Sequence, residues 1–264
     1  MKNGWLFILL LSSFINLKAQ KDFTLTADST RKKDEEKSWI LMHVAATYSV
    51  NAGDWADRYP AYTALPLRLE YYHKNKYTLG ADFSFYLGSQ VNSAGMFPDM
   101  TDEEGSLRDN NGYPAVIRYY MRGWSTRAYA LKIIPLNYNA TKEARWSLQL
   151  GGGVGYTRHY TKFNFDLDMV PQLEEEYLGG YDRLTAGTQI FEQIRFQYLN
   201  NSLVSLSAGF EFLQGFTKHQ RTYDFTTRSP QSQGYFDLGI GAFIGVIIPI
   251  KLGQTSASEE YYID

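Results

Sequence analysis

The chain has four histidines that could take part in acid–base or metal chemistry: His43, His73, His159 and His219. None has the H-x-x-x-H or H-E-x-x-H spacing that puts two imidazoles on one helix face to hold zinc. The chain has no cysteine. Thiol nucleophiles, disulfides and cysteine-bound zinc or iron–sulfur clusters are therefore excluded. We expect no metal site and no cofactor.

Two of the histidines support a hypothesis of catalysis. His159 and His219 fall near the ends of strand-like segments, and Ser125, Asp166 and Asp224 could lie near the same rim. A serine, a histidine and an aspartate can act as nucleophile, general base and orienting acid. Polar residues fill every loop, however, and ordinary loop positions explain the same pattern. We interpret the chain as a non-enzyme, and an outer-rim hydrolase of lipids or peptides remains an alternative.

Two further motifs resemble binding loops only superficially. The glycine-rich run 151–155 lacks the lysine and serine that end a phosphate-binding loop, and no helical pattern follows it. The acidic stretches 99–104 and 174–176 do not have the spacing of a calcium loop, so solvated loop charge explains them.

The elements that would position these residues are strands. From Tyr77 to Leu87, apolar residues alternate with small or polar ones, which is typical of a half-buried strand. The same alternation recurs about eight times. The expected strands are 39–50, 63–74, 77–87, a bent strand within 113–138, 145–165, 184–199, 202–216 and 234–251.

The fourth strand is the least regular. Its clearest alternation puts Tyr129, Leu131 and Ile133 on one face, which we predict to be the apolar outer face. Ala128, Ala130 and Lys132 then share the opposite face. Near residues 134–135 the two faces exchange, as a bulge would cause.

The connections alternate between long and short. Long loops at 51–62, 89–112, 166–183 and 217–233 are interleaved with short turns at 75–76, 140–144 and 200–201. Outer-membrane barrels sort their loops in this way, with short periplasmic turns and long extracellular loops. We predict an all-β, transmembrane, up-and-down antiparallel β-barrel of eight strands, with both termini in the periplasm.

The apolar faces of such a barrel point to lipid, and the opposite faces point into the lumen. Charged groups inside need partners of opposite sign, and eight strands leave an interior that side chains can fill. We therefore predict a filled lumen with a polar network. A narrow channel for small solutes is the alternative. The residues of the predicted network are His43, Arg68, Glu70, Asp82, Lys132, Arg195, Glu211 and Asp237.

The ends of the chain have a different composition. Residues 1–19 are predicted to be a signal peptide, because Lys2 precedes an apolar run and Ala19 offers a cleavage point. Residues 20–38 form a polar periplasmic arm, 39–252 the barrel and 253–264 a polar periplasmic tail. The formal net charge is -2, with 26 basic and 28 acidic residues. The charge balance is not strongly basic, so it does not suggest nucleic acid as a partner.

Three segments carry a resemblance to a known family: the signal ending Lys18-Ala19-Gln20, the glycine-rich strand 150–156 and the closing strand 241–250. The chain resembles small outer-membrane β-barrel proteins of the Bacteroidota type, OmpA/OmpX-like eight-stranded barrels with secretion-accessory barrels among the relatives. The resemblance implies a porin-like fold in the outer membrane of a Gram-negative cell envelope, and it transfers no catalytic residue.

We therefore expect a non-enzymatic barrel that acts as a structural or docking subunit of an envelope complex, with a secretion complex as one candidate, or through its extracellular loops. Its expected partners are outer-membrane lipid, lipopolysaccharide and envelope or secretion-complex proteins.

Overall fold

The structure, a computed structural model, describes residues 38–73, 76–98, 100–104, 106–136, 144–165, 170, 173, 175–200, 205–230 and 234–250. The predicted signal peptide and the periplasmic tail lie outside these residues, as does all of the arm except Ser38.

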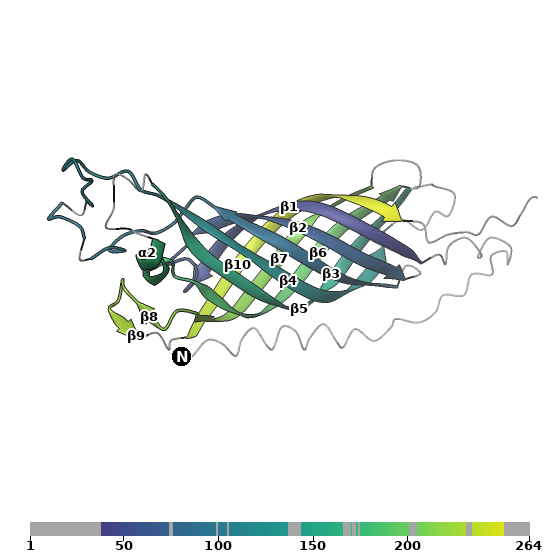
Figure 1. The fold of residues 1–264 in the computed structure, drawn as a ribbon. Coiled ribbons are helices and arrows are strands. Elements are labelled where there is room, and N and C mark those ends of the chain that lie inside the picture. Colours follow the sequence, from purple (N-terminus) through teal and green to yellow (C-terminus); the bar gives the residue numbers. More distant parts are fainter. Residues whose placement is uncertain are drawn as a thin grey trace, which may run out of the picture. The chain divides into compact units, whose positions relative to one another are not determined.

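Eight long strands form a closed barrel (Figure 1). Each pairs with its neighbours in antiparallel register, and the first strand closes the ring against the last. The predicted all-β, eight-stranded, up-and-down barrel is therefore confirmed. Around the ring the strands are β1 (Trp39–Gly53), β10 (Gly234–Ile250), β7 (Ser205–His219), β6 (Thr185–Asn200), β5 (Ala144–Asn164), β4 (Arg118–Pro135), β3 (Tyr77–Gly88) and β2 (Ala61–His73).

Burial alternates along the strands with a period of two. On β3, Asp82 and Ser84 are buried inside the ring, whereas Phe83 and Phe85 are exposed on its outside. The same division, with an apolar outer face, holds on β1, β2, β6, β7 and β10. An apolar exterior around a polar interior is the reverse of a water-soluble barrel and is the pattern of a barrel that spans a membrane.

The predicted faces of β4 are wrong. Tyr129, Leu131 and Ile133 are buried inside the barrel, and Lys132 is exposed on the outside. The register with β5 runs without interruption from Arg118 to Pro135, so the predicted exchange of faces does not occur. On this strand small alanines face outward and large apolar residues face inward. On the other strands most of the large apolar side chains face outward.

Long connections lie at one end of the barrel and short turns at the other. The long ones carry short elements that the sequence did not predict: α2 (Glu175–Tyr181), β8 (Tyr223–Asp224) and β9 (Ser229–Pro230), all at one end of the barrel (Figure 1). The connections between β3 and β4, β5 and β6, and β7 and β10 share an apolar cluster to which Phe97, Leu173, Tyr181 and Phe225 contribute. The long loops thus pack into one body above the barrel.

No helix among the described residues is long and apolar enough to cross a membrane.

Candidate functional site

Charged side chains fill the middle of the barrel in two groups. Glu70, on β2, is the centre of the first. Its Oε1 accepts hydrogen bonds from Arg195 Nη1 at 2.6 Å and from the Tyr129 hydroxyl at 2.5 Å. Its Oε2 lies 2.9 Å from His43 Nε2. Glu70 therefore contacts side chains from β1, β4 and β6, across the full width of the interior.

The second group is built around Arg127, on β4. Its Nε lies 2.9 Å from both carboxylate oxygens of Asp82, and its Nη1 lies 3.2 Å from Glu211 Oε2. Arg68 approaches the same Glu211 oxygen at 3.6 Å. The Arg127 guanidinium also lies over the Phe191 ring, 4.4 Å from its centroid. Such stacking leaves the donor edge of the guanidinium free for carboxylates.

Strand register explains how residues distant in sequence meet in this second group. Arg68 is directly opposite Asp82 between β2 and β3, and Asp82 is directly opposite Arg127 between β3 and β4. Three adjacent strands therefore present charges of alternating sign at one level. Oppositely charged cross-strand neighbours attract one another, and this attraction favours the observed register of the three strands.

Charges of the two signs balance inside the barrel. Among the residues that the structure describes, four guanidinium groups and four carboxylates are buried there, each within reach of an opposite charge: Arg58, Arg68, Arg127, Arg195, Glu70, Asp82, Glu211 and Asp237. Removing one partner of such a pair leaves a desolvated charge and is strongly destabilising. The network therefore stabilises the fold, whatever function it also serves.

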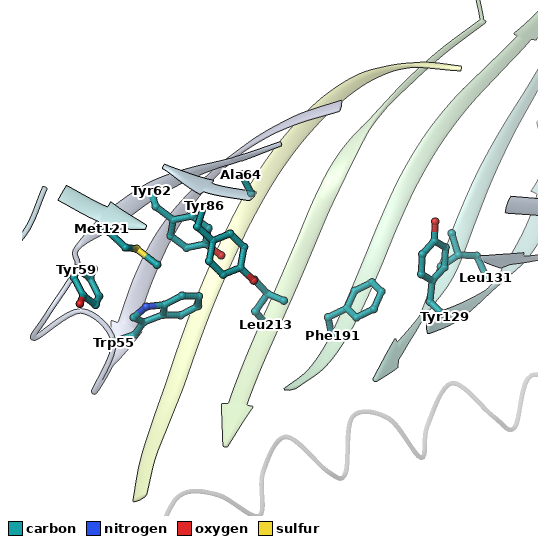
Figure 2. Packing of buried hydrophobic residues seen from close by; sticks show 10 residues of the cluster. All are labelled: Trp55, Tyr59, Tyr62, Ala64, Tyr86, Met121, Tyr129, Leu131, Phe191 and Leu213. Atoms are coloured by element: carbon teal, nitrogen blue, oxygen red, sulfur yellow. The ribbon is translucent and has the colours of Figure 1, made fainter. Parts of the chain in front are cut away.

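Apolar layers close the interior above and below the charges. At the end where β1 begins and β10 ends, Leu41, Tyr72, Ile133 and Ile247 pack together across the barrel. Toward the long loops, the rings of Trp55, Tyr62 and Tyr86 pack against one another at tilted angles, with ring centroids 4.8 to 6.2 Å apart (Figure 2). Both ends of the charged interior are thus covered by packed side chains.

The connection 54–60 between β1 and β2 folds into the mouth of the barrel as a plug. Arg58 reaches inward and donates to Asp237 at 2.5 Å and to the Thr185 hydroxyl at 2.8 Å. Asp237 also accepts from the Thr217 hydroxyl at 2.6 Å. Tyr59 is fully buried, and burial raises the pKa of its phenol, so it stays neutral beside Thr161.

Seven of the eight residues predicted for the lumen network lie inside the barrel. Six of them belong to the two central groups, whereas Asp237 lies nearer the mouth and pairs with Arg58. Lys132 does not belong to the network, because it is on the outer face of β4 near the end of the strand. The six central residues are His43, Arg68, Glu70, Asp82, Arg195 and Glu211.

Three residues of the network were missed by sequence analysis. Arg127 and Tyr129 were placed on no face or on the wrong one, although Ser125 and Arg127 together mark the polar parity of β4. That parity was the signal that could have found them. Arg58 left no such signal, because its position depends on how the connection between β1 and β2 folds back.

The described residues of the hydrolase hypothesis are not arranged as a catalytic set. His159 is buried, with its ring stacked on Trp55 at 5.2 Å and its Nε2 3.4 Å from the Arg58 guanidinium. A cation beside a histidine is the opposite of the carboxylate that orients a general base.

The other members of that hypothesis serve local structure or lie outside the described residues. Asp224 accepts from the backbone N–H of Thr226 at 2.7 Å, as a turn-forming aspartate does. His219 Nδ1 lies 3.2 Å from the backbone N of Arg221. Asp166 is not among the described residues. Within the described part of the chain, no group of histidine, aspartate and glutamate side chains is arranged to hold a metal ion.

Comparisons with known proteins assign no family to the chain. No protein-family model and no curated protein matches the sequence. Among solved structures, the chain is similar to Neisserial surface protein A, with 10% identity over 81% of this chain and 99% of that one and a TM-score of 0.44.

Two further solved structures have lower TM-scores. The Yersinia pestis attachment invasion locus protein Ail, in complex with the heparin analogue sucrose octasulfate, has 12% identity over 81% and 99% of the two chains and a TM-score of 0.39. The N-terminal β-barrel domain of Pseudomonas aeruginosa OprF has 9% identity over 80% and 100%, with a TM-score of 0.34. Similarity this low carries no argument about function.

Proposed function

We propose that this protein is a non-enzymatic barrel of the outer membrane, with its long loops outside the cell and both termini in the periplasm. The height of its apolar exterior supports this. On the outer face of β5, Trp146 and Tyr156 are ten residues apart, with Leu148, Leu150 and Val154 between them. At about 3.3 Å per residue and a tilt of about 40°, this span rises roughly 25 Å, the height of the apolar band of outer-membrane barrels.

Aromatic side chains mark both limits of this band. Trp146 packs against Tyr198 at one limit, with ring centroids 4.7 Å apart. Trp124 packs against Tyr156 at the other, 5.9 Å apart. Such rings favour the boundary between lipid and water. The long loops then project into the extracellular space, and outer-membrane lipid and lipopolysaccharide surround the barrel.

The role we propose is that of a structural or docking subunit of an envelope complex, with a secretion complex as one candidate. One observation carries it: the lumen is filled and covered at both ends, beneath loops that share their own apolar cluster. A filled lumen offers no path for a solute, so the surface of the loop body is what remains for interaction.

The tip of the connection between β3 and β4 is the part of this surface best suited to docking. Tyr113 is 70% exposed and Val116 is 76% exposed. Exposed apolar side chains close together on a well-packed support are typical of protein interaction sites. Hydrolysis has less support, because His159 is sealed beneath Trp55 and Tyr59.

The test combines conductance with co-purification. In planar bilayers we expect no conductance above background, and a steady conductance would overturn the filled lumen. From native envelopes in mild detergent, we expect stable co-purification of an envelope protein, which a Tyr113→Ser/Val116→Ser variant loses. Tyr77→Ser, an exposed aromatic at the other end of the barrel, is the control and should retain the partner. Equal retention by both variants would contradict docking through this tip.

A further inference from the structure

A cluster of cations lies on the outside of β4 and β5, just beyond the aromatic boundary at Trp124 and Tyr156. The cations are Arg118 and Arg122 on β4 and Arg158 and Lys162 on β5. The register makes them neighbours, because Arg122 pairs with Tyr160, and Arg158 and Lys162 are the residues on either side of Tyr160 on the same face. Tyr120 pairs with Lys162, so aromatic rings are interleaved with the charges.

These four cations have no acidic partner among the described residues. Arg122 donates to the backbone carbonyl of Met121 at 2.8 Å and lies over the Tyr120 ring at 4.9 Å. Neither contact neutralises its charge. Arg118, Arg158 and Lys162 are exposed. Side chains that could pair inside the barrel do so, and this outward group is left with its charge unbalanced.

Arg122 and Arg158 lie at the level of lipid headgroups, and Arg118 and Lys162 lie four residues further along their strands, toward the long loops. Arg158 is two residues beyond Tyr156 on the same face of β5, which is roughly 5 Å higher along the barrel axis at the rise and tilt given above. Arginine and lysine at such a boundary extend their apolar stems along the barrel while the charged ends meet phosphate.

An apolar groove lies directly below the cluster on the same outer face. It has a volume of about 620 Å³, which is within the range of ligand sites. Its floor is formed where small residues of β3 and β4 leave space beside larger ones of β5 and β6. The residues that line it include Ala81, Thr126, Ala128, Val154, Tyr156 and Ile190.

We propose that the cluster and the groove together form a site for a phosphorylated, acylated lipid of the outer leaflet, such as the lipid A part of lipopolysaccharide. Phosphate groups bind Arg122, Arg158 and Lys162, and an acyl chain lies along Ala128. The inference rests on the proposed location in the outer membrane, and it assigns residues to a lipid contact that the location alone leaves unspecified.

The test uses the full chain refolded in vesicles of neutral phosphatidylcholine. Folding is followed by heat-modifiable migration in gels, and diphosphoryl lipid A is then added. The test variant is Arg158→Gln/Lys162→Gln. The matched control is Lys76→Gln/Lys132→Gln, which removes the same charge from exposed side chains at the opposite end of the barrel. The apparent affinity is read from the rise in unfolding temperature with lipid A concentration.

We expect the wild type and the control to be stabilised by lipid A and the test variant to bind it roughly 25-fold more weakly. This corresponds to about fivefold for each cation at an anionic surface. An Ala128→Leu variant, which fills the groove, should also weaken binding. Ala46→Leu, an exposed alanine on β1, should not. Dephosphorylated lipid A should fail to stabilise any variant, and free inorganic phosphate should not replace the lipid.

Three results would overturn the site. One is equal loss of lipid A binding in the test and control variants. Another is stabilisation by dephosphorylated lipid. The third is full replacement by inorganic phosphate or a soluble polyanion, which would assign the cluster to another ligand. If the chain folds in vesicles and gives the gel shift, these results reject the lipid site alone. If no gel shift appears in any lipid, the membrane barrel itself is rejected.

Discussion

Two arginines on the same strand show how differently the barrel treats charge on its two faces. Arg127 points inward, where Asp82 and Glu211 neutralise it and Phe191 packs against it. Arg122, five residues earlier, points outward, contacts only backbone carbonyls and Tyr120, and has no acidic partner among the described residues. The alternation of a strand puts these two neighbours in opposite environments.

The difference follows from the cost of leaving a charge unpaired. Inside, where little water can reach, an isolated guanidinium costs several kcal/mol, so every charge there has a partner. Outside, water and headgroups solvate the same group, and its charge remains available for a ligand. Paired charges therefore mark structure in this barrel, and the unpaired group marks a surface for binding.

The largest expected effect comes from breaking the interior network at Glu70. Glu70→Ala removes the carboxylate oxygen to which Arg195 Nη1 and the Tyr129 hydroxyl donate. We expect a loss of about 3–5 kcal/mol in the free energy of unfolding. Urea unfolding in vesicles, followed by tryptophan fluorescence, measures it. Glu70→Gln keeps an acceptor oxygen and should lose less. A loss under about 1 kcal/mol for the alanine variant would show that the network contributes no more than a surface pair.

The same contrast explains which parts of the fold the sequence could predict. On β3, large apolar residues alternate with Asp82 and Ser84, so size and polarity agree and the face assignment was confirmed. On β4 they disagree. Tyr129 is large and aromatic, yet it faces inward because its hydroxyl reaches Glu70 and its ring packs edge-on against Phe191. A face assignment based on hydrophobicity alone placed Tyr129 outside. It therefore placed Lys132, which is on the opposite face of the strand, inside.

The plug could not be predicted for a different reason. Alternation fixes the faces of a strand, but it carries no information about the path of the connection 54–60. Arg58 enters the mouth because the rings of Trp55 and Tyr59 are buried there. The backbone N–H of Arg58 also donates to the carbonyl oxygen of Trp55 at 3.1 Å, which holds the turn. The contacts of the buried rings and of the Arg58 guanidinium are tertiary, with residues of β3, β5, β6 and β10.

A smaller effect is expected from a glycine beneath the network. A Cβ on Gly80 would lie 2.5 Å from the ring of Tyr129, so this ring packs directly on the glycine. Gly80→Ala should displace the ring and weaken its hydrogen bond to Glu70, at a cost of about 1–3 kcal/mol. The same unfolding assay measures the loss. Gly234→Ala is the control, because the nearest atom to its Cβ would be 3.8 Å away. Equal losses in both variants would contradict this packing account.

The smallest expected effect concerns an exposed pair in the loops, where charge contacts charge in water. Arg108 lies 2.6 Å from Asp102, and Asp102 also accepts the backbone N–H of Ser106 at 2.8 Å. This backbone hydrogen bond, with Arg108, lowers the pKa of the Asp102 carboxyl.

A lowered pKa in the folded state gives a contribution that is present above the unfolded value and lost as the pH falls through the folded value. The loss should therefore begin only below about pH 4. Asp102→Asn should leave global unfolding unchanged within error at neutral pH, because exposed pairs contribute little.

Its effect should appear locally, as faster amide exchange at Ser106 in the wild type when the pH is lowered, after correction for the intrinsic rate. An Asp102→Asn variant should lack this pH dependence, and Glu103→Gln, an exposed neighbour, should retain it. A large loss of global stability in Asp102→Asn would mean that charges in the loop body, like those in the lumen, are shielded from water. The contrast between the paired interior and the solvated exterior would then not extend to the loops.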